Sequence, residues 1–148
     1  MAIPDLDSEG FLPVGIHSCS FDELRERFAR FQRSDRRIRL CDKLEKYVKE
    51  LASTGLAKAL IVDGSFVTAI DEPGDIDLVL VLTADHDMDA TVRPFEYNTL
   101  SKRMVSKLYS FDLLVAIEDS PELEKYLSFF QQVKYREDRL KGVLRVQP

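Results

Sequence analysis

The chain has 148 residues, of which 45% are hydrophobic and 32% are charged, and its formal net charge is −5. These values are typical of a globular protein with a buried core, and we expect residues 1–148 to form a single domain. The negative charge argues against sequence-independent binding to a nucleic acid backbone, because such binding needs several Lys or Arg side chains on one face. It does not exclude a nucleotide that is bound through a metal ion.

The cysteines and the apolar stretches indicate where the protein resides. Cys19 and Cys41 lack the CxxC spacing and have no His cluster near them, so we expect two free thiols in a reducing compartment. No apolar stretch approaches the roughly 20 residues of a membrane span, and the acidic start MAIPDLDSEG is unlike a signal peptide. We therefore expect a cytoplasmic protein without a membrane partner.

Two helices are predicted after the short extended segment FLPVGIH. Ser20, with Glu23 three residues later, forms a capping-box pattern that predicts a helix from Phe21 to about Phe31. A second helix is expected over residues 34–53, with Gly55 as its C-terminal stop. Its apolar residues recur at helical spacing, namely Cys41, Leu44, Val48 and Leu51.

Strands and helices alternate in the rest of the chain. Buried strands are predicted in KALIVDGS (58–65), DIDLVLVL (75–82) and SFDLLVAI (110–117), and an edge strand in KGVLRVQ (141–147). Helices are predicted over residues 94–108 and 120–130, the second with Ser120 as its N-cap. This order indicates an α/β fold in which a small mixed β-sheet is flanked by helices, including the two N-terminal ones.

Carboxylates occur at the starts of two predicted strands. Asp75 and Asp77 point to the same face of their strand, with Cα atoms about 7 Å apart, and Asp112 lies near the start of the next strand. A DxD pair is commonly a solvated strand end, and Asp112 alone would pass as a strand-edge charge. Asp77, however, stands in an apolar run, where an unpaired buried carboxylate costs on the order of several kcal/mol. Together the three residues predict a magnesium site.

A Gly-Ser pair and its following turn suggest a place for phosphate. Gly64 and Ser65 follow the first buried strand, and Pro73 with Gly74 forces a turn just before Asp75. If SFVTA forms one helical turn, its N–H groups and the Ser65 hydroxyl would face phosphate oxygens. A plain turn is the other interpretation. The acidic run TADHDMDA, with His86, Asp87 and Asp89, is interpreted as a solvated loop rather than a set of ligands.

The stretch DGSFVTAIDEPGDIDLVLVL resembles the signature of the polymerase-β-type nucleotidyltransferase superfamily. That signature consists of a Gly-Ser pair, a spacer, Asp-x-Asp and a third carboxylate on a later strand. Here nine residues separate Gly64 and Ser65 from Asp75 and Asp77, and FDLLV supplies Asp112. More narrowly, LPVGIH, DGSFVTA, PGDIDL and YLSFFQ…KGVLRV resemble a poorly characterised bacterial family of minimal nucleotidyltransferase-like proteins, and these pieces cover nearly the whole chain.

The resemblance implies a nucleotidyltransferase fold and a reaction. A Mg²⁺- or Mn²⁺-dependent enzyme would transfer a nucleoside monophosphate from a nucleoside triphosphate, ATP first among them, to a hydroxyl group and release pyrophosphate. By the same resemblance, Asp75 and Asp77 would hold the metal ion that carries the triphosphate. Asp112 would complete a second metal site and help to deprotonate the acceptor, while Gly64 and Ser65 would hold the outer phosphates.

The resemblance leaves the triphosphate contacts and the acceptor open. Lys102 and Arg103 are candidates for the triphosphate contacts, although solvated surface charge is their plainer interpretation. Larger members of the superfamily have an extra helical domain that clamps base and acceptor. We expect a protein partner or a second copy of this chain to replace it, as in a toxin-antitoxin or phage-defence pair, with a protein or an RNA as acceptor.

Two further stretches bear on partners. RSDRRIR (33–39) opens a predicted helix and is interpreted as a solvated face. Phe129 and Phe130 are candidates for a partner contact, with burial against the sheet as the alternative. A different class of function also fits: a non-catalytic interaction module, antitoxin-like or regulatory, that binds a partner through the fold. Metal-dependent release of pyrophosphate would separate the two functions.

Overall fold

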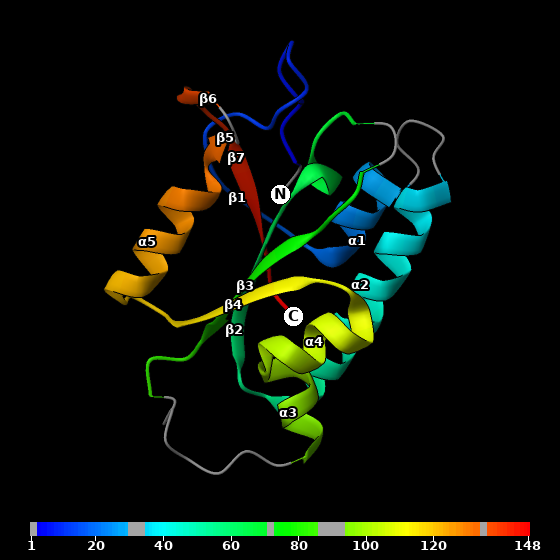
Figure 1. The fold of residues 1–148 in the computed structure, drawn as a ribbon, viewed down its shortest axis with the longest axis vertical. Coiled ribbons are helices and arrows are strands. Elements are labelled where there is room, and N and C mark those ends of the chain that lie inside the picture. Colours follow the sequence, from blue (N-terminus) through cyan, green and yellow to red (C-terminus); the bar gives the residue numbers. More distant parts are fainter. Residues whose placement is uncertain (1–2, 30–34, 71–72, 86–93, 134–135) are drawn as a thin grey trace.

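The computed structural model describes residues 3–29, 35–70, 73–85, 94–133 and 136–148. In these residues a five-stranded mixed sheet forms the centre of the fold, with helices on both faces (Figure 1). Its strands, in spatial order, are β1 (Gly15–Cys19), β7 (Gly142–Val146), β2 (Ala57–Asp63), β3 (Asp77–Leu82) and β4 (Asp112–Ile117). The predicted α/β class is confirmed, whereas the nucleotidyltransferase fold stays a prediction.

The prediction of an edge strand at residues 141–147 is wrong, because β7 lies inside the sheet. It pairs parallel with β1 on one side and antiparallel with β2 on the other. The N-terminal segment passes close to Gly142, whose N–H donates to the Leu12 carbonyl over 2.9 Å. A Cβ atom at position 142 would lie 2.0 Å from the Pro13 carbonyl oxygen, so glycine is required there. The chain after Pro13 then forms β1 and takes the edge position.

The helices include two that begin after their predicted caps, Ser20 and Ser120. The described helices are α1 (Phe21–Leu24), α2 (Asp35–Thr54), α3 (Pro94–Leu100), α4 (Lys102–Tyr109) and α5 (Pro121–Phe130). The capping box of α1 is confirmed: the Glu23 N–H donates to the Ser20 hydroxyl over 3.1 Å, and the Ser20 N–H donates to the Glu23 carboxylate over 3.0 Å. The chain continues from α1 into a π-helical turn, η1 (Arg25–Ala29), and the predicted end near Phe31 lies outside the described residues.

The single helix predicted over residues 94–108 is in fact two helices, α3 and α4. Ser101 interrupts them with extended backbone, at φ −84° and ψ 122°. Its hydroxyl accepts a hydrogen bond from the Met104 N–H over 3.3 Å and so caps α4. A serine side chain that satisfies a free N–H group in this way favours a helix start over a helix interior. The break places α4 beside the start of β4.

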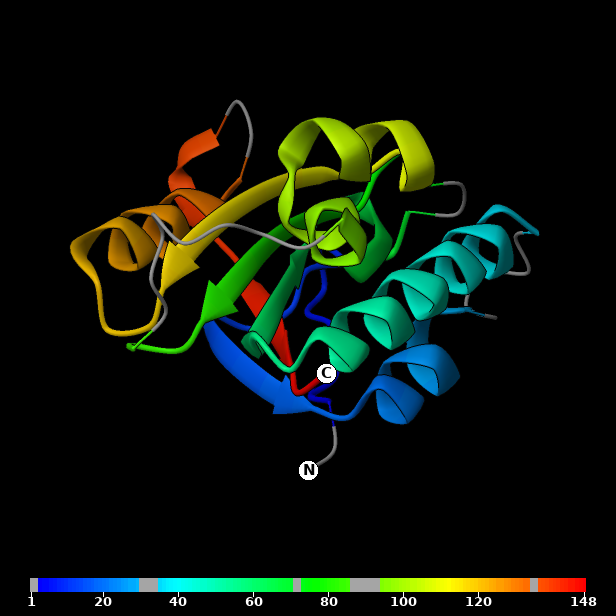
Figure 2. The same ribbon diagram turned by 90° about the horizontal axis from the view of Figure 1, so that it is seen from below.

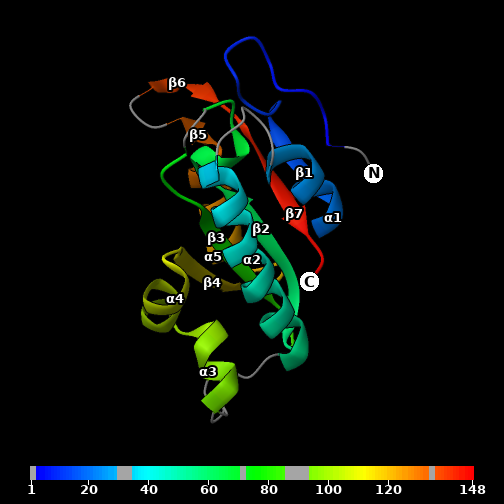
Figure 3. The ribbon, with the colours of Figure 1, turned by 90° about the vertical axis from the view of Figure 1, so that its right-hand side faces the viewer.

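Two apolar cores cover the two faces of the sheet. Helices α1, α2 and α4 pack on one face, and α5 packs on the other (Figures 1 and 2). Alternate residues of β3 divide between them: Leu78 and Leu80 join the larger core, and Val79 and Val81 join the smaller one. Figure 3 shows α2 lying in front of the sheet, with α3 and α4 at its lower end.

Both cysteines are buried and free, as predicted. Burial raises the pKa of the Cys19 and Cys41 thiols to about 11, so neither provides a thiolate nucleophile near neutral pH. Among the described helices, none combines the length and the apolar character needed to cross a membrane.

Candidate functional site

Three aspartates lie in one row at an edge of the sheet, where β2 ends and β3 and β4 begin. Asp63 is the register partner of Asp77 in the β2–β3 pair, and Asp77 is the register partner of Asp112 in the β3–β4 pair. Residues paired in this way project from the same face of a sheet. We call Asp63, Asp77 and Asp112 the carboxylate row. Two residues further along β3, Val79 points to the same face and belongs to the core that packs against α5. The carboxylate row therefore lies on the face of the sheet that α5 covers.

Asp77, in the middle of the carboxylate row, is surrounded by negative charge. Its side chain is half-buried, and burial is the main cause that raises its pKa from 3.8 to about 6. The charges of Asp75, Asp63 and Asp112 act in the same direction, and the Lys141 ammonium opposes them. Asp77 is therefore a carboxylate whose charge is only partly compensated by the protein.

Asp63 has a resident counter-ion. The Lys141 ammonium donates to its carboxylate, and both side chains are nearly inaccessible to solvent. Burial raises the pKa of Asp63, while the charge of Lys141 and its hydrogen bond act against that rise. Because a lone buried carboxylate is very unfavourable, the contact with Lys141 stabilises the ionised form of Asp63. The pair removes Asp63 from the carboxylates left for an external cation.

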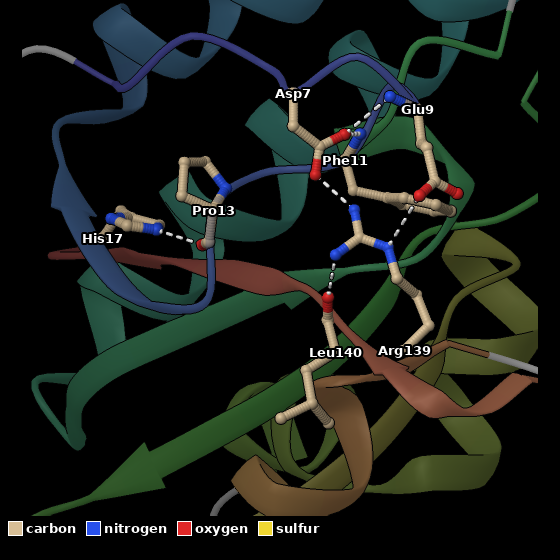
Figure 4. A network of polar contacts seen from close by, with 7 residues as sticks. All are labelled: Asp7, Glu9, Phe11, Pro13, His17, Arg139 and Leu140. Carbon is tan, nitrogen blue, oxygen red and sulfur yellow. Dashed lines mark hydrogen bonds and ion pairs between the residues drawn. The ribbon is translucent and has the colours of Figure 1, made fainter.

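The N-terminal segment and a small two-stranded sheet, β5 (Gln132–Val133) and β6 (Arg136–Leu140), position Lys141. The Lys141 N–H donates to the Gln131 carbonyl over 2.8 Å. Two residues before it, Arg139 forms ion pairs with Asp7 and Glu9 and stacks its guanidinium 5.0 Å from the centre of the Phe11 ring (Figure 4). These contacts tie the N-terminal segment to the end of β6, which directly precedes Lys141.

Nearby, the His17 ring nitrogen Nε2 lies 2.7 Å from the Pro13 carbonyl oxygen (Figure 4). This contact holds the turn that leads from the N-terminal segment into β1. His17 is thus engaged with the backbone on the far side of β7 from the carboxylate row, and the site gains no imidazole from it.

Of the two interpretations of the Gly-Ser pair, a helical turn and a plain turn, the structure shows the helical turn, as the 3₁₀ segment η3 (Ser65–Val67). Its N–H groups are not free, however. The Asp75 carboxylate oxygen Oδ1 accepts from the Ser65 N–H over 2.8 Å and from the Ser65 hydroxyl over 2.6 Å, and the Phe66 N–H donates to the Asp75 carbonyl over 3.3 Å. Asp75 thus occupies the position that we expected for a phosphate oxygen.

Gly64 allows this close approach. Its φ is +95°, in the region that favours glycine, and a Cβ atom there would lie 3.1 Å from both the Asp75 carbonyl oxygen and the Asp77 nitrogen. The turn, Asp75 and the start of β3 therefore pack backbone against backbone. A larger residue at position 64 would push Asp75 away from Ser65.

The structure brings the predicted metal ligands into one region without closing them into a coordination sphere. Asp77 and Asp112 face each other in register, while Asp75 is directed to Ser65. Among the described residues, no group of three or more His, Cys, Asp or Glu side chains that could hold a metal ion is found. The loop residues His86, Asp87 and Asp89 lie outside the described part of the chain.

Two pockets adjoin Asp112. The first has a volume of about 250 Å³ and is lined by Asp77, Lys102, Asp112, Leu113, Leu114, Phe129 and Phe130. The second has a volume of about 520 Å³ and is lined by Lys102, Arg103, Ser106, Lys107 and Asp112. The exposed basic residues of α4 therefore lie beside the carboxylate row, and Lys102 and Asp112 belong to both pockets.

The comparisons with known proteins place the chain in one family. Residues 4–147 match the family of unknown function DUF6932. The chain belongs to this family. No curated protein and no solved structure gives a significant match. Because the description of DUF6932 states no activity, the resemblance to nucleotidyltransferases stays a prediction.

In this DUF6932 protein, an arginine that the sequence analysis assigned to a solvated face anchors the Gly-Ser turn. Arg37 is completely buried and donates to the carbonyls of Phe66, Thr68 and Ile70, over 2.6 Å each. Its guanidinium lies 5.5 Å from the centre of the Phe66 ring. The interpretation of residues 33–39 as a solvated face is therefore wrong at Arg37, and Arg33 and Ser34 lie outside the described residues.

The signal for Arg37 was present in the helical spacing. The apolar face of α2 contains Cys41 and Leu44, and four residues before Cys41 the same face reaches position 37. The charge of the neighbouring residues concealed this position. Arg36, one residue earlier, donates to the carbonyls of Pro73 and Gly74 and so holds the chain just before Asp75.

Proposed function

We propose that this protein is a Mg²⁺- or Mn²⁺-dependent nucleotidyltransferase. It transfers a nucleoside monophosphate from a nucleoside triphosphate, ATP first among them, to a hydroxyl group of a protein or RNA acceptor, and pyrophosphate is released. One observation carries the proposal: Asp77 and Asp112 lie in register at the wall of one pocket, and a second pocket that shares Asp112 and Lys102 with it is lined by the basic residues of α4. Carboxylates for a cation next to cations for phosphates are the arrangement that phosphoryl and nucleotidyl transfer requires.

The donor chemistry fits a hard divalent cation. Asp75, Asp77 and Asp112 would hold the ion, and all their donor atoms are carboxylate oxygens, which Mg²⁺ and Mn²⁺ prefer. The raised pKa of Asp77 supports the fit, because burial first and the neighbouring carboxylates second disfavour its charged form, which a divalent cation would stabilise. When bound, such ions stabilise the charge on the reacting phosphate and on the attacking and leaving oxygens.

Asp75 links the binding of cation and phosphate. In the structure its carboxylate takes both donors of Ser65, the N–H and the hydroxyl. To join Asp77 and Asp112 it has to leave Ser65, and the same movement frees these two donors for a phosphate oxygen. The exchange loses no hydrogen bond, since a phosphate oxygen accepts where the carboxylate accepted before.

The remaining residues of the site have complementary roles. Lys102, Arg103 and Lys107 would neutralise the phosphates that extend along α4. Asp112 is exposed where the two pockets meet, so it would take the proton from the acceptor hydroxyl. Because the chain carries a net charge of −5, a partner protein or a second copy of the chain would present the acceptor. The two proteins would then form a toxin-antitoxin or phage-defence pair.

One observation favours a second candidate function, a non-catalytic interaction module. The hydrogen bonds between Asp75 and Ser65 close the Gly-Ser turn without any ligand. A regulatory or antitoxin-like subunit would keep this closed turn and bind its partner through exposed apolar side chains such as Phe129. Such a module would release no pyrophosphate from a nucleoside triphosphate under any metal condition.

Transfer of label from α-labelled nucleoside triphosphates tests the proposal. The purified protein is incubated with Mg²⁺ or Mn²⁺ and with a candidate partner or total RNA, and labelled product and pyrophosphate are measured together. Asp77→Asn and Asp112→Asn should abolish both signals. The matched control is Asp22→Asn, the same chemical change at an exposed position in the first turn of α1.

Circular dichroism and thermal unfolding establish that each variant is folded before its activity is compared. Equal label transfer by wild type and Asp77→Asn would reject the catalytic role of the carboxylate row. Partner binding without release of pyrophosphate by the wild type would favour the non-catalytic module instead.

A further inference from the structure

Phe129 is a large aromatic side chain in an unusual position. It lies one residue before the end of α5, and 64% of it is exposed to solvent. Its neighbour Phe130 is buried in the core under the sheet, with ring centres 6.2 Å apart and planes tilted by 46°. The core therefore uses Phe130 and leaves Phe129 to the surface, where it lines the same pocket as Asp77 and Asp112.

That pocket has two chemically different parts. Leu113, Leu114, Phe129 and Phe130 provide apolar wall, and Asp77, Asp112 and Lys102 provide charge. Lys102 and Asp112 also line the second pocket, which continues along the basic residues of α4. The aromatic wall of the first pocket and the cations of the second are thus joined by the shared residues Lys102 and Asp112. A nucleoside triphosphate likewise has a flat base at one end and a chain of phosphates at the other.

We infer that the aromatic part of this pocket binds the nucleobase of the nucleoside triphosphate, with Phe129 stacked on the base. The phosphates then extend past Lys102 into the pocket lined by Arg103 and Lys107. This inference rests on the proposed function and adds the substrate's orientation, which the Gly-Ser and Asp-x-Asp motifs do not specify. Phe129 is a binding residue in this arrangement and takes no part in the chemical step.

Size and lining support a base as the occupant. A volume of about 250 Å³ is below the range of roughly 300–1,000 Å³ that holds drug-sized ligands, so the pocket suits one ring system better than a peptide segment. Its described lining residues include no amide or hydroxyl side chain that would read the edge of a base. Stacking on an aromatic ring is tolerant of base identity. The pocket should therefore accept all four bases, with purines preferred for their larger stacking surface.

The chain allows a direct test because it contains no tryptophan. Phe129→Trp places a single fluorescent reporter in the proposed wall and keeps an aromatic surface. Its emission should be quenched in a saturable way by Mg²⁺ with ATP and be unchanged by Mg²⁺ with inorganic tripolyphosphate, which carries the phosphates but no base.

Binding to the wild type and to Phe129→Ala is then measured by calorimetry. The loss of stacking should weaken the binding of ATP by about 5- to 150-fold and leave the binding of tripolyphosphate unchanged. Leu108→Ala is the matched control, since it removes an exposed apolar side chain of α4 that lines neither pocket. It should bind both ligands like the wild type.

The remaining outcomes are distinguishable. If Phe129→Ala binds ATP as tightly as the wild type does, the base lies elsewhere, and this inference fails while the proposed function stands. If the wild type binds neither ATP nor tripolyphosphate, the proposed function fails and the inference fails with it. If the tryptophan emission of Phe129→Trp responds to a partner protein but to no nucleotide, the aromatic surface is a protein contact and the inference is wrong.

Discussion

Asp77→Asn should make the protein more stable at neutral pH, although it removes a residue of the proposed site. In the structure the pKa of Asp77 rises from 3.8 to about 6, first through burial and then through the charges of Asp75, Asp63 and Asp112. Such a rise corresponds to about 3 kcal/mol, since each pKa unit is worth about 1.4 kcal/mol. Solvent screening of the half-buried side chain reduces this figure, so we expect Asn to raise the free energy of unfolding by about 1–3 kcal/mol.

The pH dependence of this difference has a definite sign. A carboxyl group whose pKa is raised in the folded state is protonated more readily there than in the unfolded chain. Well below pH 4 both states are protonated, and the aspartate has no charge penalty. The penalty grows from about pH 4 to pH 6 and is complete above about pH 7. The advantage of Asp77→Asn should therefore vanish in acid and reach its maximum at neutral pH.

Urea unfolding followed by circular dichroism, in buffers with a metal chelator, measures this difference at several pH values. Replacing the chelator with millimolar Mg²⁺ should raise the melting temperature of the wild type but not that of Asp77→Asn, because a ligand bound to the folded state stabilises it by mass action. If Asp77→Asn were less stable than the wild type at pH 7, or if the difference did not change with pH, our account of Asp77 as an under-compensated carboxylate would be refuted.

Three other substitutions test the elements around the carboxylate row. Lys141→Met should lower the free energy of unfolding by about 3–5 kcal/mol, because it leaves the buried Asp63 carboxylate without its counter-ion. The added change Asp63→Asn should restore most of this loss, and urea unfolding measures both effects. Arg37→Met should cost at least about 3 kcal/mol in the same assay, since a buried guanidinium with several carbonyl partners is lost. Ser65→Ala should have opposite effects in calorimetry: tighter Mg²⁺ binding without nucleotide, because Asp75 loses one of its two donors at Ser65, and weaker tripolyphosphate binding; equal effects on both would contradict the proposed exchange.

The local parts of this site could be predicted from the sequence. Apolar runs of the right length identified β2, β3 and β4. The period of two along a strand then predicts which face the carboxylates at the strand ends project from. Asp77 and Asp112 then lie together because both open neighbouring strands. The 3₁₀ turn at Ser65 was also predictable, because Gly64 and Ser65 interrupt a strand and favour a tight turn.

The long-range parts were not predictable from local patterns. Nothing in KGVLRVQ indicates that β1 covers its outer edge, since strand pairing depends on residues more than a hundred positions away. Lys141 and Asp63 are 78 positions apart, and neither has a sequence neighbour that reveals the pairing. Asp75 as the acceptor at Ser65 was missed for a different reason: the same donors suit a carboxylate or a phosphate, and sequence spacing does not distinguish the two acceptors.

The distribution of charge explains why these distant residues matter for the site. Four aspartates gather at this edge of the sheet, and Lys141 forms an ion pair with only one of them, Asp63. Among the described residues, Asp75, Asp77 and Asp112 form no ion pair. The pair with Lys141 therefore leaves three carboxylates without an ion-pair partner among the described residues, and these are the three that the Asp-x-Asp motif and its later strand identify. This division, with one acidic side chain neutralised internally and three left for an external cation, is the reason why we propose a divalent metal ion at this edge of the sheet.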